Sequence, residues 1–145
     1  MLHGRAYLDS RPENDIPFLT GEYKSGVVLL RSFPMAFNTS SLKVRQELVH
    51  MQEWRCHKNL VKFLGVAEVR RQRYIVSELS LLGDLRTLLN SVSQQHLLTQ
   101  PVRFNMARGV AEGMRYLHEQ MIVHGNLRSS SVYVESDWSV KISDW

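Results

Sequence analysis

Cysteine is nearly absent from this sequence, because Cys56 is the only one in 145 residues. A single cysteine excludes an internal disulfide framework and a zinc site built from several cysteines, and it favours a reducing compartment. Long apolar runs are missing too, since no stretch reaches the about 18 apolar residues that a membrane-spanning helix needs. The stretch 1–15 also lacks the apolar core of a signal peptide. We therefore expect no membrane insertion by this segment.

Charge of one sign is not in large excess. The 18 Lys and Arg residues stand against 14 Asp and Glu residues, which leaves a formal charge of +4. A nucleic-acid-binding protein usually carries a clustered basic stripe, so we expect no nucleic-acid partner. Repeats and low-complexity segments are absent, and 43% of the residues are hydrophobic. These features predict one folded unit with a real core.

The first half of the chain has the pattern of an antiparallel sheet. Four short β-branched or apolar runs are separated by polar turn material, and they occupy 17–23, 27–33, 60–69 and 74–79. The stretch 41–54 interrupts them with apolar residues at helical spacing, so it predicts one amphipathic helix. This combination is typical of a small α+β lobe, which we place at about 15–79.

The second half reads as mostly helical. We predict a short helix over 84–90 and a longer one over 101–120. Gly109 and Gly113 would let a neighbour pack close to the longer helix. A short hairpin is expected over 131–135 and 139–143, and we assign the whole of 80–145 to the start of a second lobe. The chain ends directly after the last strand, which predicts a truncated domain.

Seven ordered sequence patterns resemble the protein-kinase family, and together they extend over about 15–145. The last of them is Asp144 with Trp145, where the family has D-F-G. The others are Val28-Leu29-Leu30-Arg31 for V-A-I-K, Glu47 in the following helix, His57-Lys58-Asn59-Leu60-Val61, the hinge-like Ile75-Val76-Ser77-Glu78, Gly83-Asp84-Leu85, and His124-Gly125-Asn126-Leu127 with Ser131 for H-R-D-L-x-x-x-N. The resemblance implies a kinase-like fold with a five-stranded antiparallel first lobe and one helix.

The family's functions can be carried over to these positions residue by residue. The resemblance makes Asn126 and His124 the catalytic-loop residues, and it makes Asp144 and Ser131 the metal ligands. It implies vestigial nucleotide contacts at Leu29, Arg31, Glu47, Ser77, Glu78 and Ser80.

Several departures from the family pattern predict weak or absent chemistry. No G-x-G-x-x-G precedes the Arg31 strand, so the lid over the phosphates is missing. Leu29 narrows the adenine slot, and Arg31 replaces a compact lysine ammonium by a longer planar group. Asn126 cannot accept a proton as a carboxylate does, and Ser131 offers a weaker metal ligand than asparagine. We therefore expect a pseudokinase in which ATP and Mg²⁺ bind weakly or not at all.

The segment from His124 to Trp145 looks most like the kinase-homology domain of receptor guanylyl cyclases. That resemblance implies a non-catalytic regulatory module on the cytoplasmic side of a membrane receptor, paired in a dimer and working with other domains of the same receptor or a protein partner. Other segments look more like tyrosine kinases or the pseudokinase domain of Janus kinases. The alternative interpretation is a fragment of a divergent, ATP-binding tyrosine-type kinase.

Plainer interpretations remain open for four of these positions. Arg31 and Glu47 could form a structural ion pair between strand and helix without touching a nucleotide. His124 could be a core histidine that packs beneath the last strand, in a column that also includes Met51 and Trp145. Asp144 could be a metal ligand or a solvated turn residue.

Overall fold

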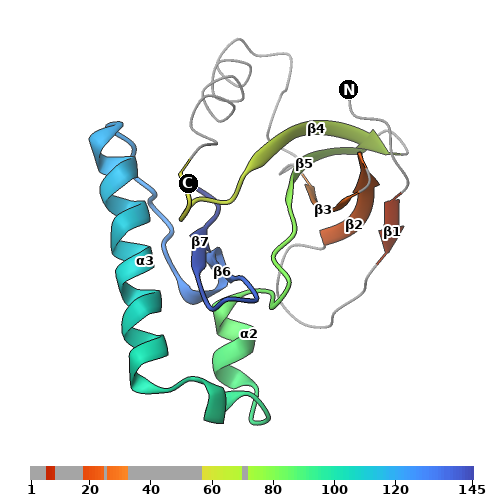
Figure 1. The fold of residues 1–145 in the computed structure, drawn as a ribbon. Helices are drawn as coiled ribbons and strands as arrows, with labels where there is room; N and C mark the ends of the chain where they lie inside the picture. The colour runs from red at the N-terminus through yellow and green to blue at the C-terminus, as the bar shows by residue number, and fades with distance from the viewer. Residues whose placement is uncertain (1–5, 9–17, 25, 33–56, 70–71) are drawn as a thin grey trace. The chain divides into compact units, whose positions relative to one another are not determined.

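The computed structural model describes residues 6–8, 18–24, 26–32, 57–69 and 72–145 (Figure 1). The chain divides into two compact units, one made of 1–55 and 62–79 and the other of 56–61 and 80–145. Within the described residues, no helix is both long and apolar enough to cross a membrane. The helix predicted over 41–54 lies outside the described residues.

The first unit contains a five-stranded antiparallel sheet with the strand order β1-β2-β3-β5-β4. Its strands are β1 (Ala6–Leu8), β2 (Phe18–Tyr23), β3 (Gly26–Ser32), β4 (Phe63–Val69) and β5 (Gln72–Glu78). The antiparallel arrangement and the four predicted strands are confirmed. The sequence reading assigned no residues to β1, because three residues are too short to show an alternating pattern.

The central strand β3 is buried on both faces. Val28 and Leu30 pack on one face with Ala67 and Val76. Leu29, on the opposite face, is only 4% exposed. A stretch with two covered faces is a continuous apolar run, which is why 28–30 carries no alternation between apolar and polar residues, whereas Val27 before it is 57% exposed.

β4 begins three residues later than the apolar run that predicts it. Leu60 forms an isolated parallel bridge with Ile142, and the Val61 N–H donates to the Ile142 carbonyl at 2.8 Å. The start of the run therefore pairs with a strand of the second unit's hairpin rather than with β5, because its backbone groups are already bonded there.

The second unit is built from two helices and a hairpin. Its elements are α2 (Leu85–Asn90), the 3₁₀ turn η1 (Gln95–Leu97), α3 (Gln100–Glu119), the 3₁₀ turn η2 (Ser129–Ser131), β6 (Val132–Val134) and β7 (Val140–Ile142). The predicted helices and the hairpin are confirmed. Asp84 caps α2, since its Oδ1 accepts a hydrogen bond from the Thr87 N–H at 2.9 Å.

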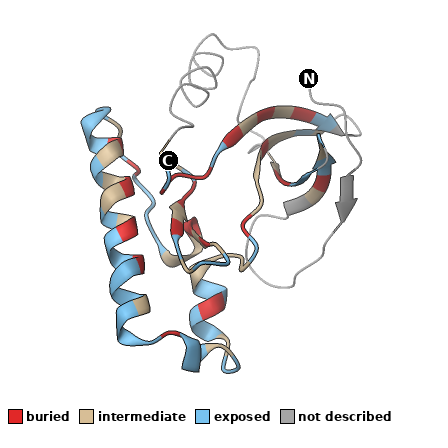
Figure 2. Ribbon diagram, in the orientation of Figure 1, coloured by how far each residue is buried: buried red, intermediate tan, exposed pale blue. Residues whose placement is uncertain are grey.

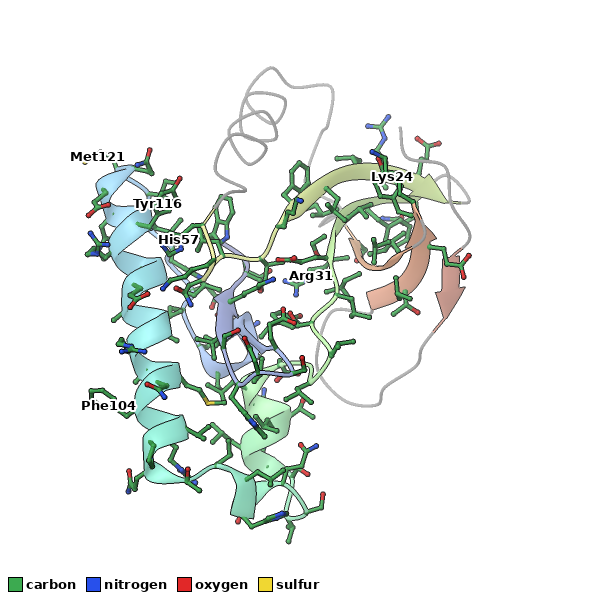
Figure 3. All side chains as sticks on the ribbon, in the orientation of Figure 1. Lys24, Arg31, His57, Phe104, Tyr116 and Met121 are labelled. Carbon is green, nitrogen blue, oxygen red and sulfur yellow. The ribbon has the colours of Figure 1, made fainter. Side chains whose placement is uncertain are left out.

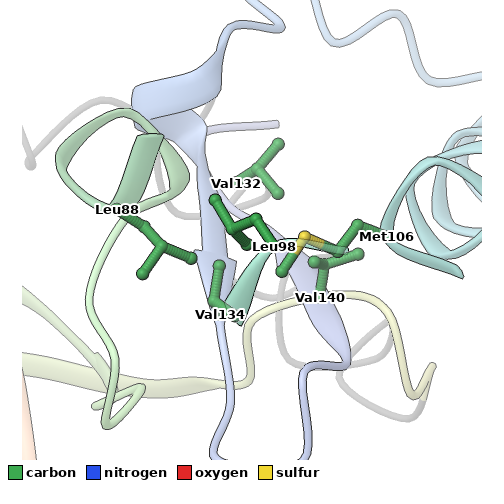
Figure 4. Packing of buried hydrophobic residues seen from close by; sticks show 6 residues of the cluster. All are labelled: Leu88, Leu98, Met106, Val132, Val134 and Val140. Carbon is green, nitrogen blue, oxygen red and sulfur yellow. The ribbon is translucent and has the colours of Figure 1, made fainter. Parts of the chain in front are cut away.

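The predicted apolar face of α3 packs on the hairpin. Leu117 is fully buried in one cluster with Leu60 and Ile142, and Met106 is buried in another. The buried positions along α3 are red in Figure 2. Figure 4 shows the second cluster, which joins both helices to both strands through Leu88, Leu98, Met106, Val132, Val134 and Val140. Burying each such side chain contributes about 1.5–3 kcal/mol, so these clusters position the hairpin firmly.

The segment 57–61 is fastened to this unit by Asn59. Its Nδ2 donates to the Val140 carbonyl at 2.8 Å, and its carbonyl accepts from the Ile142 N–H at 2.8 Å. The ring of His57 stacks on Tyr116 of α3, with centroids 4.7 Å apart (Figure 3). Two buried glycines make room, because a Cβ at Gly113 would lie 2.9 Å from the Asn59 carbonyl oxygen and one at Gly109 would lie 3.0 Å from its Nδ2.

Candidate functional site

Four of the predicted nucleotide-site residues lie on neighbouring strands of the first unit. Leu29 of β3 pairs with Ser77 of β5, and Arg31 pairs with Ile75 two positions further along. Directly opposed residues share a face and side chains alternate along a strand, so Leu29, Arg31 and Ser77 occupy one face of the sheet. The side chain of Arg31 is labelled in Figure 3. The partner predicted for it, Glu47, lies outside the described residues.

Glu78 is on the other face, at the end of β5. Its Oε1 accepts a hydrogen bond from the Lys62 N–H at 2.8 Å, and its own N–H donates to the Lys62 carbonyl at 3.1 Å. The carboxylate therefore binds the backbone just before β4 and stabilises the end of the β4–β5 pair, which is a structural role.

The remaining predicted residues belong to the second unit, where His124 organises the loop before β6. Its Nε2 lies 2.8 Å from the Ser143 carbonyl oxygen, and its Nδ1 lies 3.3 Å from the Asn126 nitrogen. A carbonyl can only accept, so Nε2 donates and Nδ1 accepts from the Asn126 N–H. Both ring nitrogens are thus engaged, and the ring is buried. This geometry favours the structural interpretation of His124 over a proton shuttle.

Asn126 is exposed, and its backbone is held from two directions. Its N–H donates to His124, and its carbonyl oxygen lies 3.4 Å from the Ser131 hydroxyl. Neither contact uses the carboxamide. The shape of the loop therefore does not depend on which short polar side chain occupies position 126.

Ser131 is fully buried beneath the same loop. Its hydroxyl accepts from the Arg128 N–H at 3.0 Å and lies 2.9 Å from the Arg128 carbonyl oxygen. These contacts close the short turn η2, and the hydroxyl proton of Ser131 is donated to a backbone carbonyl. The arrangement favours a loop-closing role for Ser131.

Asp144 follows β7 at the exposed end of the hairpin. The preceding Ser143 is anchored by its N–H, which donates to the Ser131 carbonyl at 2.8 Å, and by its carbonyl on His124. Asp144 itself has φ 65°, a left-handed conformation that costs a non-glycine residue about 1–2 kcal/mol. Trp145 packs against the cluster of Leu60, Leu117 and Ile142. Asp144 is thus presented by a rigid strand end, with its carboxylate outside the core.

Within the second unit, one imidazole links the loop that carries Asn126 to the strand end that precedes Asp144. His124 bonds to Asn126 on one side and to the residue before Asp144 on the other. The structure therefore brings the predicted catalytic position and the predicted metal ligand into one hydrogen-bonded assembly.

The donor set suits a magnesium ion held mainly by its nucleotide. Among the described residues there is no group of three or more His, Cys, Asp or Glu side chains that could hold a metal. Mg²⁺ accepts one or two carboxylates and completes its shell with water and substrate phosphates. The exposed carboxylate of Asp144 fits that requirement, whereas the Ser131 hydroxyl is committed to the loop backbone.

Ser80 is the last predicted nucleotide contact, and its side chain is buried. Its hydroxyl donates to Glu135 Oε1 at 2.8 Å. Sequence reasoning missed Glu135, since it lies 55 residues away in the hairpin turn and belongs to no motif. No pattern in the sequence could have indicated this contact.

These motifs and this fold define a kinase-type domain, and comparison with known families agrees. Residues 20–145 match the family described as protein tyrosine and serine/threonine kinase. The chain belongs to this family.

Several individual relatives from different organisms are described as kinases. The chain is 30% identical over 125 residues to the mitogen-activated protein kinase kinase kinase dlk-1 of Caenorhabditis briggsae, covering 86% of the chain and 13% of the relative. It is 29% identical over 136 residues to the probable serine/threonine-protein kinase PBL28 of Arabidopsis thaliana, covering 86% and 35%. It is 36% identical over 92 residues to the cysteine-rich receptor-like protein kinase 6 of Oryza sativa, covering 61% and 13%. The chain thus spans about a third or less of each of these relatives.

Proposed function

We propose that this chain is part of a divergent protein kinase that binds ATP with Mg²⁺ and passes the γ-phosphoryl group to a hydroxyl of a protein. One observation carries the proposal: the His124 ring joins the loop that bears Asn126 to the strand end that presents Asp144. The kinase family match and the kinase relatives support this interpretation over the receptor guanylyl cyclase one.

The chain's own residues would make such a reaction slow. In the transfer, the acceptor oxygen would form a bond to the γ-phosphorus while the bond to the β–γ bridging oxygen breaks, and ADP would be the leaving group. Asp144 would supply a carboxylate to a bound Mg²⁺, which would offset negative charge on the phosphates. Asn126 can orient the hydroxyl but cannot take its proton, so the proton leaves to solvent or to the transferred phosphate. A missing general base costs about 10²- to 10⁴-fold in rate.

The second candidate is a non-catalytic regulatory module of the pseudokinase type. The engaged hydroxyl of Ser131 favours it, because a second metal ligand is then lacking beside the missing base at Asn126. In this case the domain would act through a partner, as in a receptor guanylyl cyclase.

Three variants of the full-length protein distinguish the two candidates. The assay measures transfer of labelled γ-phosphate from ATP with Mg²⁺ to the protein itself and to mixed Ser, Thr and Tyr peptides. We expect slow transfer, its loss in Asp144→Ala, and a rise of about 10²- to 10⁴-fold in Asn126→Asp. Asn105→Asp is the matched control, because it makes the same exchange at an exposed position of α3.

Two outcomes would contradict the kinase proposal. Transfer that survives in Asp144→Ala would place the activity elsewhere. No gain in Asn126→Asp, with the variant folded, would show that position 126 is not where a base is needed. In the second case the non-catalytic candidate becomes the better one.

We also propose a place on the cytoplasmic side of a membrane receptor, where the domain works as a dimer with other domains of the same receptor or with a separate protein. The receptor-like protein kinase of Oryza sativa supports a receptor context. Cross-linking of the full-length protein in intact cells, followed by fractionation, tests both the dimer and the membrane association.

A further inference from the structure

A buried polar network in the second unit is not used by the chemistry above. Ser80 is 3% exposed and donates its hydroxyl proton to Glu135 Oε1 at 2.8 Å. The Lys141 Nζ lies 3.3 Å from the same oxygen, and the side chains of Glu135 and Lys141 are each 21% exposed. One carboxylate oxygen therefore joins three parts of the unit: the segment before α2, the hairpin turn and β7.

The backbone around Glu135 holds its side chain in place. The Glu135 N–H donates to the Ser139 carbonyl at 2.9 Å, and the Trp138 N–H donates to the Glu135 carbonyl at 3.0 Å. These bonds close the turn between β6 and β7. Because the carboxylate is largely shielded from water, its hydrogen bond and ion pair are stronger than their equivalents on an open surface.

The segment Ser80–Gly83 lies along β6 as well. The Leu82 N–H donates to the Val134 carbonyl at 3.2 Å, and the Val134 N–H donates to the Gly83 carbonyl at 2.9 Å. Next to these two backbone hydrogen bonds, the Ser80 hydroxyl adds a third contact between the two segments through its bond to Glu135. Removing that contact would free the first residues of the segment while leaving the two backbone bonds in place.

We infer that Glu135 is a positioning residue that fixes Ser80 and the strand leading to Asp144 in one arrangement. Lys141 lies in β7, and Asp144 follows that strand three residues after Lys141. Glu135 thus acts on Ser80, a predicted nucleotide contact, and on Asp144, a predicted metal ligand, without touching a nucleotide itself. The consequence for nucleotide binding rests on the proposed function.

The test uses the full-length protein and a variant pair with a matched control. Glu135→Gln removes the charge, and Ser80→Ala removes the hydroxyl. Asp137→Asn is the control, because it removes the same charge from the same turn at an exposed side chain that accepts a hydrogen bond from the Ser139 N–H rather than from Ser80. Each protein is measured for ATP affinity with and without Mg²⁺, for urea unfolding and for amide hydrogen exchange.

We expect Glu135→Gln and Ser80→Ala to weaken Mg²⁺–ATP binding by about tenfold, the loss typical of a hydrogen bond to a charged group. The factor by which Mg²⁺ raises ATP affinity should fall in Glu135→Gln, since Asp144 is then less well placed. A merely structural role would lower affinity equally with and without the metal ion. The effects of the two changes should not add in the double variant, because both weaken the hydrogen bond between Ser80 and residue 135.

Hydrogen exchange separates failure of this inference from failure of the proposed function. If the unaltered protein binds no ATP, the proposed function fails, and faster exchange of both 80–83 and 140–143 in Ser80→Ala still supports the coupling. Unchanged exchange in Ser80→Ala, or equal effects of Glu135→Gln and Asp137→Asn, would overturn the inference. Ser80→Ala serves as the deciding variant if Glu135→Gln does not fold.

Discussion

The Nε2 atom of His124 and the carbonyl oxygen of Ser143 are 2.8 Å apart, and this bond joins the loop before β6 to the end of β7. With the second ring nitrogen on Asn126, one side chain links two segments that are 17 residues apart or more along the chain. The two hydrogen bonds of this imidazole therefore help to hold the loop against the end of β7.

Replacing His124 should destabilise the second unit. His124→Ala leaves the buried Ser143 carbonyl without this donor and opens a cavity, so the free energy of unfolding should fall by about 1–3 kcal/mol. Urea denaturation measures the loss. His96→Ala is the control, since His96 is exposed in η1 and should change stability by less than about 0.5 kcal/mol. Equal effects of the two substitutions would contradict the structural role.

Enlarging Gly113 should disturb the contact between α3 and the segment 57–61. A Cβ there would lie 2.9 Å from the Asn59 carbonyl oxygen and 2.9 Å from Ile142 Cδ1. Alanine favours a helix by about 1 kcal/mol, but overpacking of this kind costs about 1–3 kcal/mol. We expect a net loss of stability for Gly113→Ala, measured by thermal unfolding. A higher melting temperature would show that the helix can move away.

Acid should weaken the attachment of the segment 57–61. Burial, followed by the nearby Lys58, lowers the pKa of His57 below its ordinary value of 6.5. The unfolded chain then binds the proton more tightly, so this contribution to stability is present above pH 6.5 and lost as the pH falls through the folded pKa. Protonation of Nδ1 also removes the acceptor for the Asn59 N–H.

A variant isolates this dependence from that of the other histidines. Unfolding in urea at a series of pH values between about 7 and 5 should show a shallower loss of stability in His57→Gln than in the unaltered chain. Parallel curves for the two proteins would mean that His57 does not contribute.

The start of α2 offers a test of local structure. Asp84 accepts from the Thr87 N–H at 2.9 Å and from the Thr87 hydroxyl at 2.7 Å. Asp84→Ala should lower the free energy of unfolding by about 0.5–2 kcal/mol, whereas Asp84→Asn keeps a capping oxygen and should cost less. Chemical denaturation of both variants measures the difference, and a reversed order would argue against capping.

Much of the fold could be predicted from local patterns. The spacing of Met106 and Leu117 on α3 indicates its buried face, and the turn residues around Asp137 predict the hairpin. β1 could not be predicted, because its three residues are too few to show a period. The pairing of Leu60 with Ile142 could not be predicted either, because it joins segments 82 residues apart. Periodicity reports which residues are buried and says little about distant partners.

Sequence motifs predict the positions of the candidate site but not its geometry. Ordered motifs located His124, Asn126 and Asp144. The left-handed backbone of Asp144 and the loop-closing bonds of Ser131 depend on distant atoms, so no spacing rule reveals them. The kinase relatives favour a divergent protein kinase over a receptor guanylyl cyclase module, because a few residues of catalytic-loop similarity cannot separate related subfamilies.

The backbone bonds of Asn126 have a consequence for how such a domain can change over time. Its neighbours hold the amide and the carbonyl, and neither contact involves the side chain. Asparagine and aspartate codons differ by a single base at the first position. Under the proposed function, one point mutation would therefore exchange the carboxamide for a carboxylate without touching the backbone bonds of the loop, so gain and loss of a proton acceptor would each take a single step.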